Sequence, residues 1–224
     1  MKTKLIIFFL LSAMGLCNAQ TVYLYTPNGS QVRAFINSEM SSSDIAYYTK
    51  ECATLYPNAE ILANASSTYN CHSYAWNMTE GGTVCWLNQS PDLHLYWDDG
   101  SYEVTTEANA EKIFYYNDDH SAVKSTTYAG KYESKWGSYP LVRHSPEYGP
   151  SIYNMQYRRY YRRKCLDVFA NQTVTTNTTV NGCTNLNVQN VTVTNNALLK
   201  LDAPGDIVIT GPFEVQAGSS LQVK

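Results

Sequence analysis

The pattern of apolar and polar positions divides the chain into a front that contains helices and a back built from short strands. A helical stretch that Ser43 or Asp44 can cap ends before Pro57, and residues 71–77 predict a second helix that two glycines stop. Further short elements are a helix at Thr106–Glu111 and strands at Thr21–Tyr25, Leu93–Trp97, Lys112–Tyr116, Ser121–Ser125, Lys131–Trp136 and Leu141–His144. This order predicts an α+β domain over residues 20–150.

Residues 165–224 carry five short apolar runs separated by turn residues. Each run places two apolar side chains on one face: Val191–Val193, Leu199–Leu201, Ile207–Ile209, Phe213–Val215 and Leu221–Val223. Evenly spaced short strands favour a small all-β solenoid, in which each rung covers the apolar face of the one before. A small sandwich is the alternative. The segment resembles the short right-handed β-helical tail of many exported bacterial proteins, which implies a spacer, an attachment or a surface for a partner.

The expected linker at residues 151–164 contains a basic run, Arg158–Lys164, interleaved with Tyr160 and Tyr161. Such a run can contact nucleic acid, anionic lipid or acidic glycan. It is more often a solvated strand or linker whose tyrosines pack between two domains, and we favour that interpretation.

The composition points away from disorder and from nucleic-acid binding. The chain has 224 residues, 44% of them hydrophobic, and a net charge of −3, so it can bury a core and has no general basic character. We therefore expect no nucleic acid as partner.

Residues 1–19 have the pattern of a secretory signal peptide. Lys2 and Lys4 precede an apolar run from Leu5 to Leu11, and small residues lead up to cleavage after Ala19. Lipidation of Cys17 is the alternative, although the preceding leucine is bulky. The run is too short for a transmembrane helix, which needs roughly 20 apolar residues, and no later stretch could span a membrane. We expect a secreted protein or one of the cell envelope.

Cleavage would leave five cysteines, an odd number that implies at least one unpaired thiol. Cys165 and Cys183 flank a short Thr/Asn-rich segment and could close it with a disulfide. Cys52 and Cys85 could pair in the same way, although four cysteines allow three connectivities. That would leave Cys71 free.

Cys71 lies in the first turn of a predicted helix, where the helix dipole and unpaired backbone N–H groups favour the reactive thiolate. A nucleophilic cysteine needs a base, and the chain offers four histidines: His72, His94, His120 and His144. On a helix the side chain of His72 would project about 100° away from that of Cys71. His120 opens a predicted strand directly after a turn and is the best candidate for the base.

Three segments carry a resemblance to a family: Tyr69–Trp76 around the cysteine, Asp119–Val123 around the histidine, and Ser134–Gly137 on the next strand. They are similar to the compact bacterial papain-like hydrolases, the group of the NlpC/P60 and CHAP amidases. The resemblance implies a papain-like domain over residues 20–150, with Cys71 as nucleophile and His120 as base. It also implies a polar group on the next strand that orients the imidazole, for which Ser134 is the candidate and Glu133 or His144 a substitute.

The sequence therefore predicts an exported cysteine amidase or peptidase that acts on an extracellular amide, with cell-wall peptide as the substrate class that the resemblance implies. No cofactor is expected, and no pair of His or Cys residues shows the spacing of a zinc motif. The alternative function is a non-catalytic surface or adhesion module that binds peptide or glycan and in which Cys71 is structural. Transfer rather than hydrolysis is a third possibility, since the same pair supports both.

Overall fold

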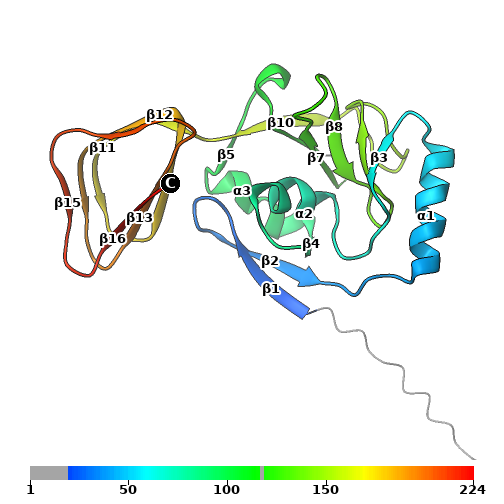
Figure 1. The fold of residues 1–224 in the computed structure, drawn as a ribbon, viewed down its shortest axis with the longest axis horizontal. Coiled ribbons are helices and arrows are strands. Elements are labelled where there is room, and N and C mark those ends of the chain that lie inside the picture. The colour runs from blue at the N-terminus through cyan, green and yellow to red at the C-terminus, as the bar shows by residue number, and fades with distance from the viewer. Residues whose placement is uncertain (1–19, 117–118) are drawn as a thin grey trace, which may run out of the picture.

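The structure is a computed structural model that describes residues 20–116 and 119–224 (Figure 1). The predicted signal peptide, residues 1–19, lies outside the described residues. Within them, no helix is long and apolar enough to cross a membrane.

A small antiparallel sheet begins the fold. It has the strand order β1-β2-β4. Its strands are β1 (Gln20–Tyr25), β2 (Gln31–Ile36) and β4 (Trp86–Leu87). The turn between β1 and β2 contains Gly29, whose φ of +91° suits a residue without a β-carbon. The strand predicted at Thr21–Tyr25 is thus confirmed.

The central feature is a seven-stranded antiparallel sheet with the order β3-β9-β8-β7-β6-β10-β5. Its strands are β3 (Glu60–Ala63), β5 (Tyr102–Val104), β6 (Lys112–Tyr115), β7 (His120–Lys124), β8 (Tyr132–Lys135), β9 (Leu141–His144) and β10 (Arg158–Arg163). The basic run expected in a linker is therefore largely a strand of this sheet, where the side chain of Tyr161 is buried.

The described residues contain three α-helices: α1 (Ser42–Leu55), α2 (Cys71–Trp76) and α3 (Leu95–Asp98). Single helical turns of the 3₁₀ type occur at Met78–Glu80 and Glu107–Asn109, and one of the π type at Gln89–Leu93. The cap of α1 is Ser41, whose hydroxyl accepts a hydrogen bond from the backbone N–H of Asp44, and not Ser43 or Asp44. The strand predicted at Leu93–Trp97 is wrong: the segment is helical, and Trp97 stacks on Tyr161 of β10 with ring centroids 5.0 Å apart.

One apolar core joins the small sheet, α2, α3 and one face of the large sheet. It is formed by Val32, Ala34, Ala75, Trp76, Cys85, Leu87, Leu93, Tyr96, Tyr102, Phe114 and Tyr161. The opposite face of the large sheet carries a second cluster around Tyr115, Ala122 and Tyr132. Because residues of a strand alternate between the two faces, consecutive residues of β7 point to opposite faces of the large sheet.

The C-terminal strands form a third, six-stranded sheet in which all pairs are parallel. The strands are β11 (Leu166–Val174), β12 (Thr178–Val193), β13 (Leu198–Asp202), β14 (Ile207–Ile209), β15 (Phe213–Val215) and β16 (Ser220–Val223). Asn171 and Asn190 adopt left-handed backbone conformations, and their side chains are hydrogen-bonded to each other at 2.8 Å.

The predicted fold class is wrong. We expected a papain-like α+β domain followed by a separate small solenoid. The described residues are instead mostly β-sheet, with 42% strand and 16% helix, and their strands form several sheets with three α-helices among them. The physical reason is that strands such as β2, β5 and β10 contain polar or charged residues between their apolar ones, so a search for apolar runs did not detect them.

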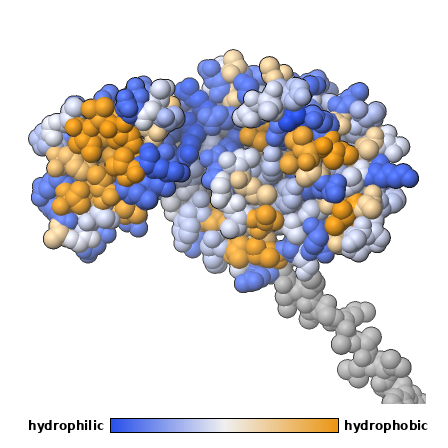
Figure 2. Space-filling view, in the orientation of Figure 1, coloured by the Kyte–Doolittle hydropathy of each residue, from blue (hydrophilic) through white to orange (hydrophobic). Residues whose placement is uncertain are grey.

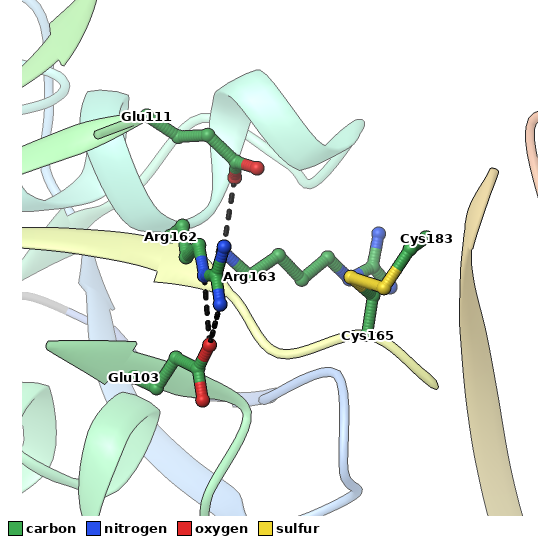
Figure 3. The surroundings of a disulfide bond; sticks show 6 residues. All are labelled: Glu103, Glu111, Arg162, Arg163, Cys165 and Cys183. Atoms are coloured by element: carbon green, nitrogen blue, oxygen red, sulfur yellow. Dashed lines mark hydrogen bonds and ion pairs between the residues drawn. A yellow bond between two sulfur atoms is a disulfide. The ribbon is translucent and has the colours of Figure 1, made fainter. Parts of the chain in front are cut away.

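A disulfide joins the end of the large sheet to the C-terminal strands (Figure 3). It links Cys165, just after β10, to Cys183 within β12. Next to it, the Arg162 guanidinium pairs with Glu103 at 2.6 Å. The expected Cys165–Cys183 bond is confirmed, whereas the expected Cys52–Cys85 bond is wrong, because both of these cysteines are free and buried in separate clusters.

Apolar side chains gather on the surface of the C-terminal strands (Figure 2). Val208, Ile209, Val215 and Val223 are each at least 38% exposed. These residues come from β14, β15 and β16, the last strands to join the sheet.

Removing the disulfide should destabilise the C-terminal sheet selectively. The bond closes a loop with a sequence separation of 18 residues, and a loop of that size is worth about 3 kcal/mol in the free energy of unfolding. The double variant C165A/C183A should therefore unfold at lower urea concentration when it is followed by far-UV circular dichroism.

The tryptophans provide an internal control, since all four lie before residue 165. Their fluorescence transition should stay where it is in the parent protein, and reducing the parent with dithiothreitol should reproduce the effect of the double variant. A circular dichroism transition that does not move would contradict the prediction.

Candidate functional site

Helix α2 and strand β7 bring the two predicted residues into one site. Cys71 is the first residue of α2, and His120 is the first residue of β7. The Cys71 sulfur lies 4.0 Å from the backbone carbonyl oxygen of Asp119, the residue just before His120. Both side chains are buried, Cys71 with 4% and His120 with 0% of its surface exposed.

Asn70 fixes the start of α2. Its side-chain oxygen accepts hydrogen bonds from the backbone N–H groups of Ser73, at 3.0 Å, and Leu87, at 3.2 Å. Its side-chain nitrogen donates to the Leu87 carbonyl at 2.7 Å. Asn70 is thus both the N-cap of α2 and a clamp between α2 and β4, and it holds Cys71 at a fixed place.

At the far end of the helix, Gly82 has no space for a β-carbon, which would lie 1.9 Å from the Asn77 side chain.

His72 is part of the site, contrary to the expectation that it would point away. Its Nε2 lies 2.6 Å from a carboxylate oxygen of Asp119, and its Nδ1 lies 2.8 Å from the Ser121 hydroxyl. The same hydroxyl accepts a hydrogen bond from the indole N–H of Trp76 at 2.9 Å. Both ring nitrogens of His72 are therefore engaged, and the ring cannot turn without breaking a bond.

His120 has the opposite environment. Apart from the nearby Cys71 sulfur, neither of its ring nitrogens has a hydrogen-bond partner among the described residues. Its ring stacks on Tyr153 with centroids 4.0 Å apart and planes 13° from parallel, and Tyr115 lies on β6 with its ring centroid 5.3 Å away. An imidazole with two free nitrogens can accept or release a proton without first losing a bond.

The electrostatics of the site favour a charged sulfur. Burial raises the pKa of the Cys71 thiol, but the imidazoles of His72 and His120 next to it lower this pKa well below its usual range. Burial lowers the pKa of His72, whereas the Cys71 sulfur and the Asp119 carboxylate raise it, with a net increase to about 9. The favoured state is a thiolate next to an imidazolium.

Asp119 completes this arrangement. Although partial burial raises the pKa of its carboxyl group, the hydrogen bond from His72 lowers it below the usual value, so the carboxylate keeps its charge. Its φ of +37° is uncommon for a residue with a β-carbon, and aspartate tolerates that region better than most residues. The strained backbone presents the carboxylate to His72 and the carbonyl to Cys71.

A pocket of about 360 Å³ opens at the cysteine. Its lining includes Cys71, His72 and Asp119 on one side, and Trp86, Leu87, Asn88, Ile152 and Tyr153 around them. Ile152 is 72% exposed and forms part of the rim. A small apolar or amide-containing group can therefore reach the sulfur from solvent.

Ser134, the predicted orienting group, is bound elsewhere. Its hydroxyl lies 2.7 Å from Nε2 of His144, whose Nδ1 is 2.8 Å from the backbone oxygen of Ser145. Burial lowers the pKa of His144 to about 4, so this pair is neutral near pH 7. The structure thus places Ser134 and His144 together and gives neither a hydrogen bond to His120. Glu133, the other substitute, binds Tyr74 and Arg143.

Lys135 is a buried cation close to the site. Its ammonium group donates to the backbone oxygens of Ser66, Gly137 and Tyr139 at 2.5 to 2.7 Å. Burial lowers its pKa to about 7, and Cys71 is the largest of the opposing influences. Its charge, when present, adds to the positive potential that favours the thiolate.

The other thiols lack these features. Burial raises the pKa of Cys52 to about 11, and it also raises that of Cys85. Among the described residues, no group of three or more His, Cys, Asp or Glu side chains is arranged to hold a metal ion.

Sequence reasoning missed His72, Asp119 and Tyr153. The available signal was the pair Asp119-His120, in which a carboxylate directly precedes the expected base at the start of a strand. For Tyr153 no local signal existed, because it lies in a loop 33 positions after His120 in the sequence.

Comparison with family models, curated proteins and solved structures yields no match for this chain.

Proposed function

We propose that the protein is a cysteine-dependent hydrolase of amide bonds, with Cys71 as its nucleophile. The observation that supports this best is the buried Cys71 sulfur in the lining of an open pocket, next to two imidazoles that lower its pKa. A thiolate in such surroundings attacks carbonyl carbon and is typical of thiol peptidases and amidases. A cysteine that only filled space would need neither the charges nor the access.

The two histidines have separate roles in this proposal. His72, bound to Asp119 and Ser121, supplies the fixed positive charge that keeps the sulfur ionised. His120, with both ring nitrogens free, carries the proton. It gives that proton to the leaving amine as the acyl-sulfur bond forms, and it then takes a proton from the water that cleaves the acyl-enzyme.

The substrate class is an extracellular peptide or a peptide of the cell wall, and the place of action is outside the cytoplasm or in the envelope. This part of the proposal rests on the signal-like pattern of residues 1–19 and on the resemblance of the motifs around Cys71 and His120 to NlpC/P60 and CHAP amidases. The disulfide between Cys165 and Cys183 suits an oxidising compartment.

Replacing the nucleophile should abolish hydrolysis. We expect Cys71→Ala to lower kcat/KM by at least about 10³-fold, because no other group in the pocket can form the acyl intermediate. The assay uses p-nitrophenyl acetate and a panel of peptidyl aminomethylcoumarin amides, and mass spectrometry of the parent protein should show an acyl adduct on Cys71.

The matched control is Cys52→Ala, which removes a buried thiol of raised pKa outside the pocket and should leave the rate within about twofold. Turnover that survives in Cys71→Ala would refute the proposed function, and a lack of turnover in the parent on every probe would favour the binding module with a structural Cys71.

The thiolate should also be visible without any substrate. His72 is cationic below its pKa of about 9, and its charge favours the thiolate, so alkylation of Cys71 by iodoacetamide should stay fast down to about pH 6. Replacing His72 by Gln keeps two polar atoms but removes the charge, and the pH at which alkylation is half-maximal should rise by about 1–2 units.

Asp119→Asn should shift that pH in the same direction by a smaller amount, since a neutral partner lowers the pKa of His72 and shortens the range over which it is cationic. Peptide mapping identifies the labelled thiol, and Cys85 serves as the unreactive internal reference. An unchanged alkylation profile in both variants would show that His72 does not set the charge of the sulfur.

A further inference from the structure

Among the described residues, no third polar side chain orients His120. The imidazole of a cysteine hydrolase has to face the sulfur, and a hydrogen bond from a third side chain is the usual means of holding it. Here, apart from the Cys71 sulfur itself, neither ring nitrogen has a partner, and Ser134, which occupies the expected strand, is bonded to His144. Something else must keep this fully buried ring in place.

Two aromatic rings contact it. Tyr153 stacks on His120 with centroids 4.0 Å apart and an interplanar angle of 13°, the closest and most parallel of the ring contacts described for this chain. Tyr115 is the register partner of His120 on β6, and its ring lies 5.3 Å away at 31°. Contact of this kind fixes the plane of the imidazole while leaving its nitrogens unbonded.

Tyr153 is itself held firmly. Its backbone N–H donates to the Pro150 carbonyl at 2.9 Å, which closes a turn. Its side chain packs against both the Tyr115–Tyr132 cluster and the Trp136–Val142 cluster. Gly137 lies near the end of the ring, since a β-carbon added to it would lie 3.4 Å from the Tyr153 hydroxyl oxygen. Gly137 and Tyr153 both line the pocket at Cys71.

We propose that Tyr153 is the positioning residue of the site, which holds the His120 ring toward Cys71 by stacking and thereby takes the place of the third polar group. The inference rests on the proposed function, since it assigns the means by which the proton-carrying histidine is oriented. It explains why both nitrogens of His120 are free: a clamp on the face of the ring needs no hydrogen bond, so the proton can move between sulfur and leaving group without disrupting an anchor.

The titratable groups that face or surround the ring are Cys71 of α2, Asp119, Tyr115 of β6, His144 of β9 and Tyr153 itself. Replacing Tyr153 leaves the other four in place. A change in the reactivity of Cys71 would therefore report on the placement of the His120 ring and not on the loss of a neighbouring charge.

The test compares Tyr153→Leu with Tyr153→Phe in the full chain. Phe keeps the stacked ring and should retain the alkylation profile of Cys71 and most of the hydrolysis of p-nitrophenyl acetate. Leu removes the ring and should lower the iodoacetamide rate about tenfold near pH 6, with little change near pH 9, because the sulfur loses the nearby imidazole that favours its ionisation. The kcat for hydrolysis should fall by about 10²-fold or more.

Two further variants keep the test decisive. Tyr153→Met fills the volume without a ring and replaces the Leu variant if the latter does not fold. Tyr157→Leu, in the same loop but paired with Tyr116 at 5.9 Å, is the matched control and should behave like the parent.

Each outcome decides the question. If the Leu and Met variants keep the parental pH profile, Tyr153 is only structural and the inference fails. If Phe loses as much as Leu, the hydroxyl and not the ring is responsible, and the stacking inference fails as well. Hydrolysis that persists in Cys71→Ala would refute the proposed function alone, since the alkylation profiles judge the placement of His120 independently of turnover.

Discussion

The Ser121 hydroxyl is the interaction on which the geometry of the site depends. It accepts a hydrogen bond from the indole N–H of Trp76 and is also hydrogen-bonded to Nδ1 of His72. This one oxygen of β7 therefore holds two successive turns of α2. Trp76 is fully buried in the main core, which makes this a joint between the core and the site. Because Ser121 is held on one face of the strand, its neighbours Asp119 and His120 are fixed relative to Cys71 as well.

A buried thiolate is costly unless charge nearby compensates for lost hydration. The site supplies this compensation through two neighbouring groups. The His72 imidazolium lies next to the sulfur, and the Asp119 carboxylate stabilises the imidazolium. The side chain of Asp119 is itself 61% exposed to water. The negative charge of Asp119 thus stays in contact with solvent, while its carboxylate raises the pKa of the buried His72. This order of burial explains how a small protein can hold an ionised sulfur without a large network.

The sequence identified Cys71 and His120 because both positions are set by local rules, the first residue of a capped helix and the first residue of a strand after a turn. The third group could not be found in this way. Ser134 is on the expected strand, yet the register of β8 and β9 brings it to His144, and register depends on the whole sheet.

His72 was set aside because ideal helix geometry separates adjacent side chains, but at a helix start both can still face the end of one strand. The fold class failed for a related reason, since β10 carries arginines on both faces and its one buried residue, Tyr161, gives only a weak apolar signal.

The contrast between the two histidines is the strongest argument that the site is built for chemistry rather than for packing. A buried imidazole in a protein core ordinarily satisfies its nitrogens, as His144 does with Ser134 and Ser145. His72 does the same, but with a carboxylate that keeps it charged. Of these three histidines, His120 alone has no hydrogen-bond partner apart from the Cys71 sulfur. Its tyrosine neighbours stack on the ring and make no hydrogen bond to it, so burying its nitrogens costs stability. A buried imidazole kept at such a cost next to a thiol of lowered pKa is accounted for if its nitrogens have a transient partner, the proton of a reacting molecule.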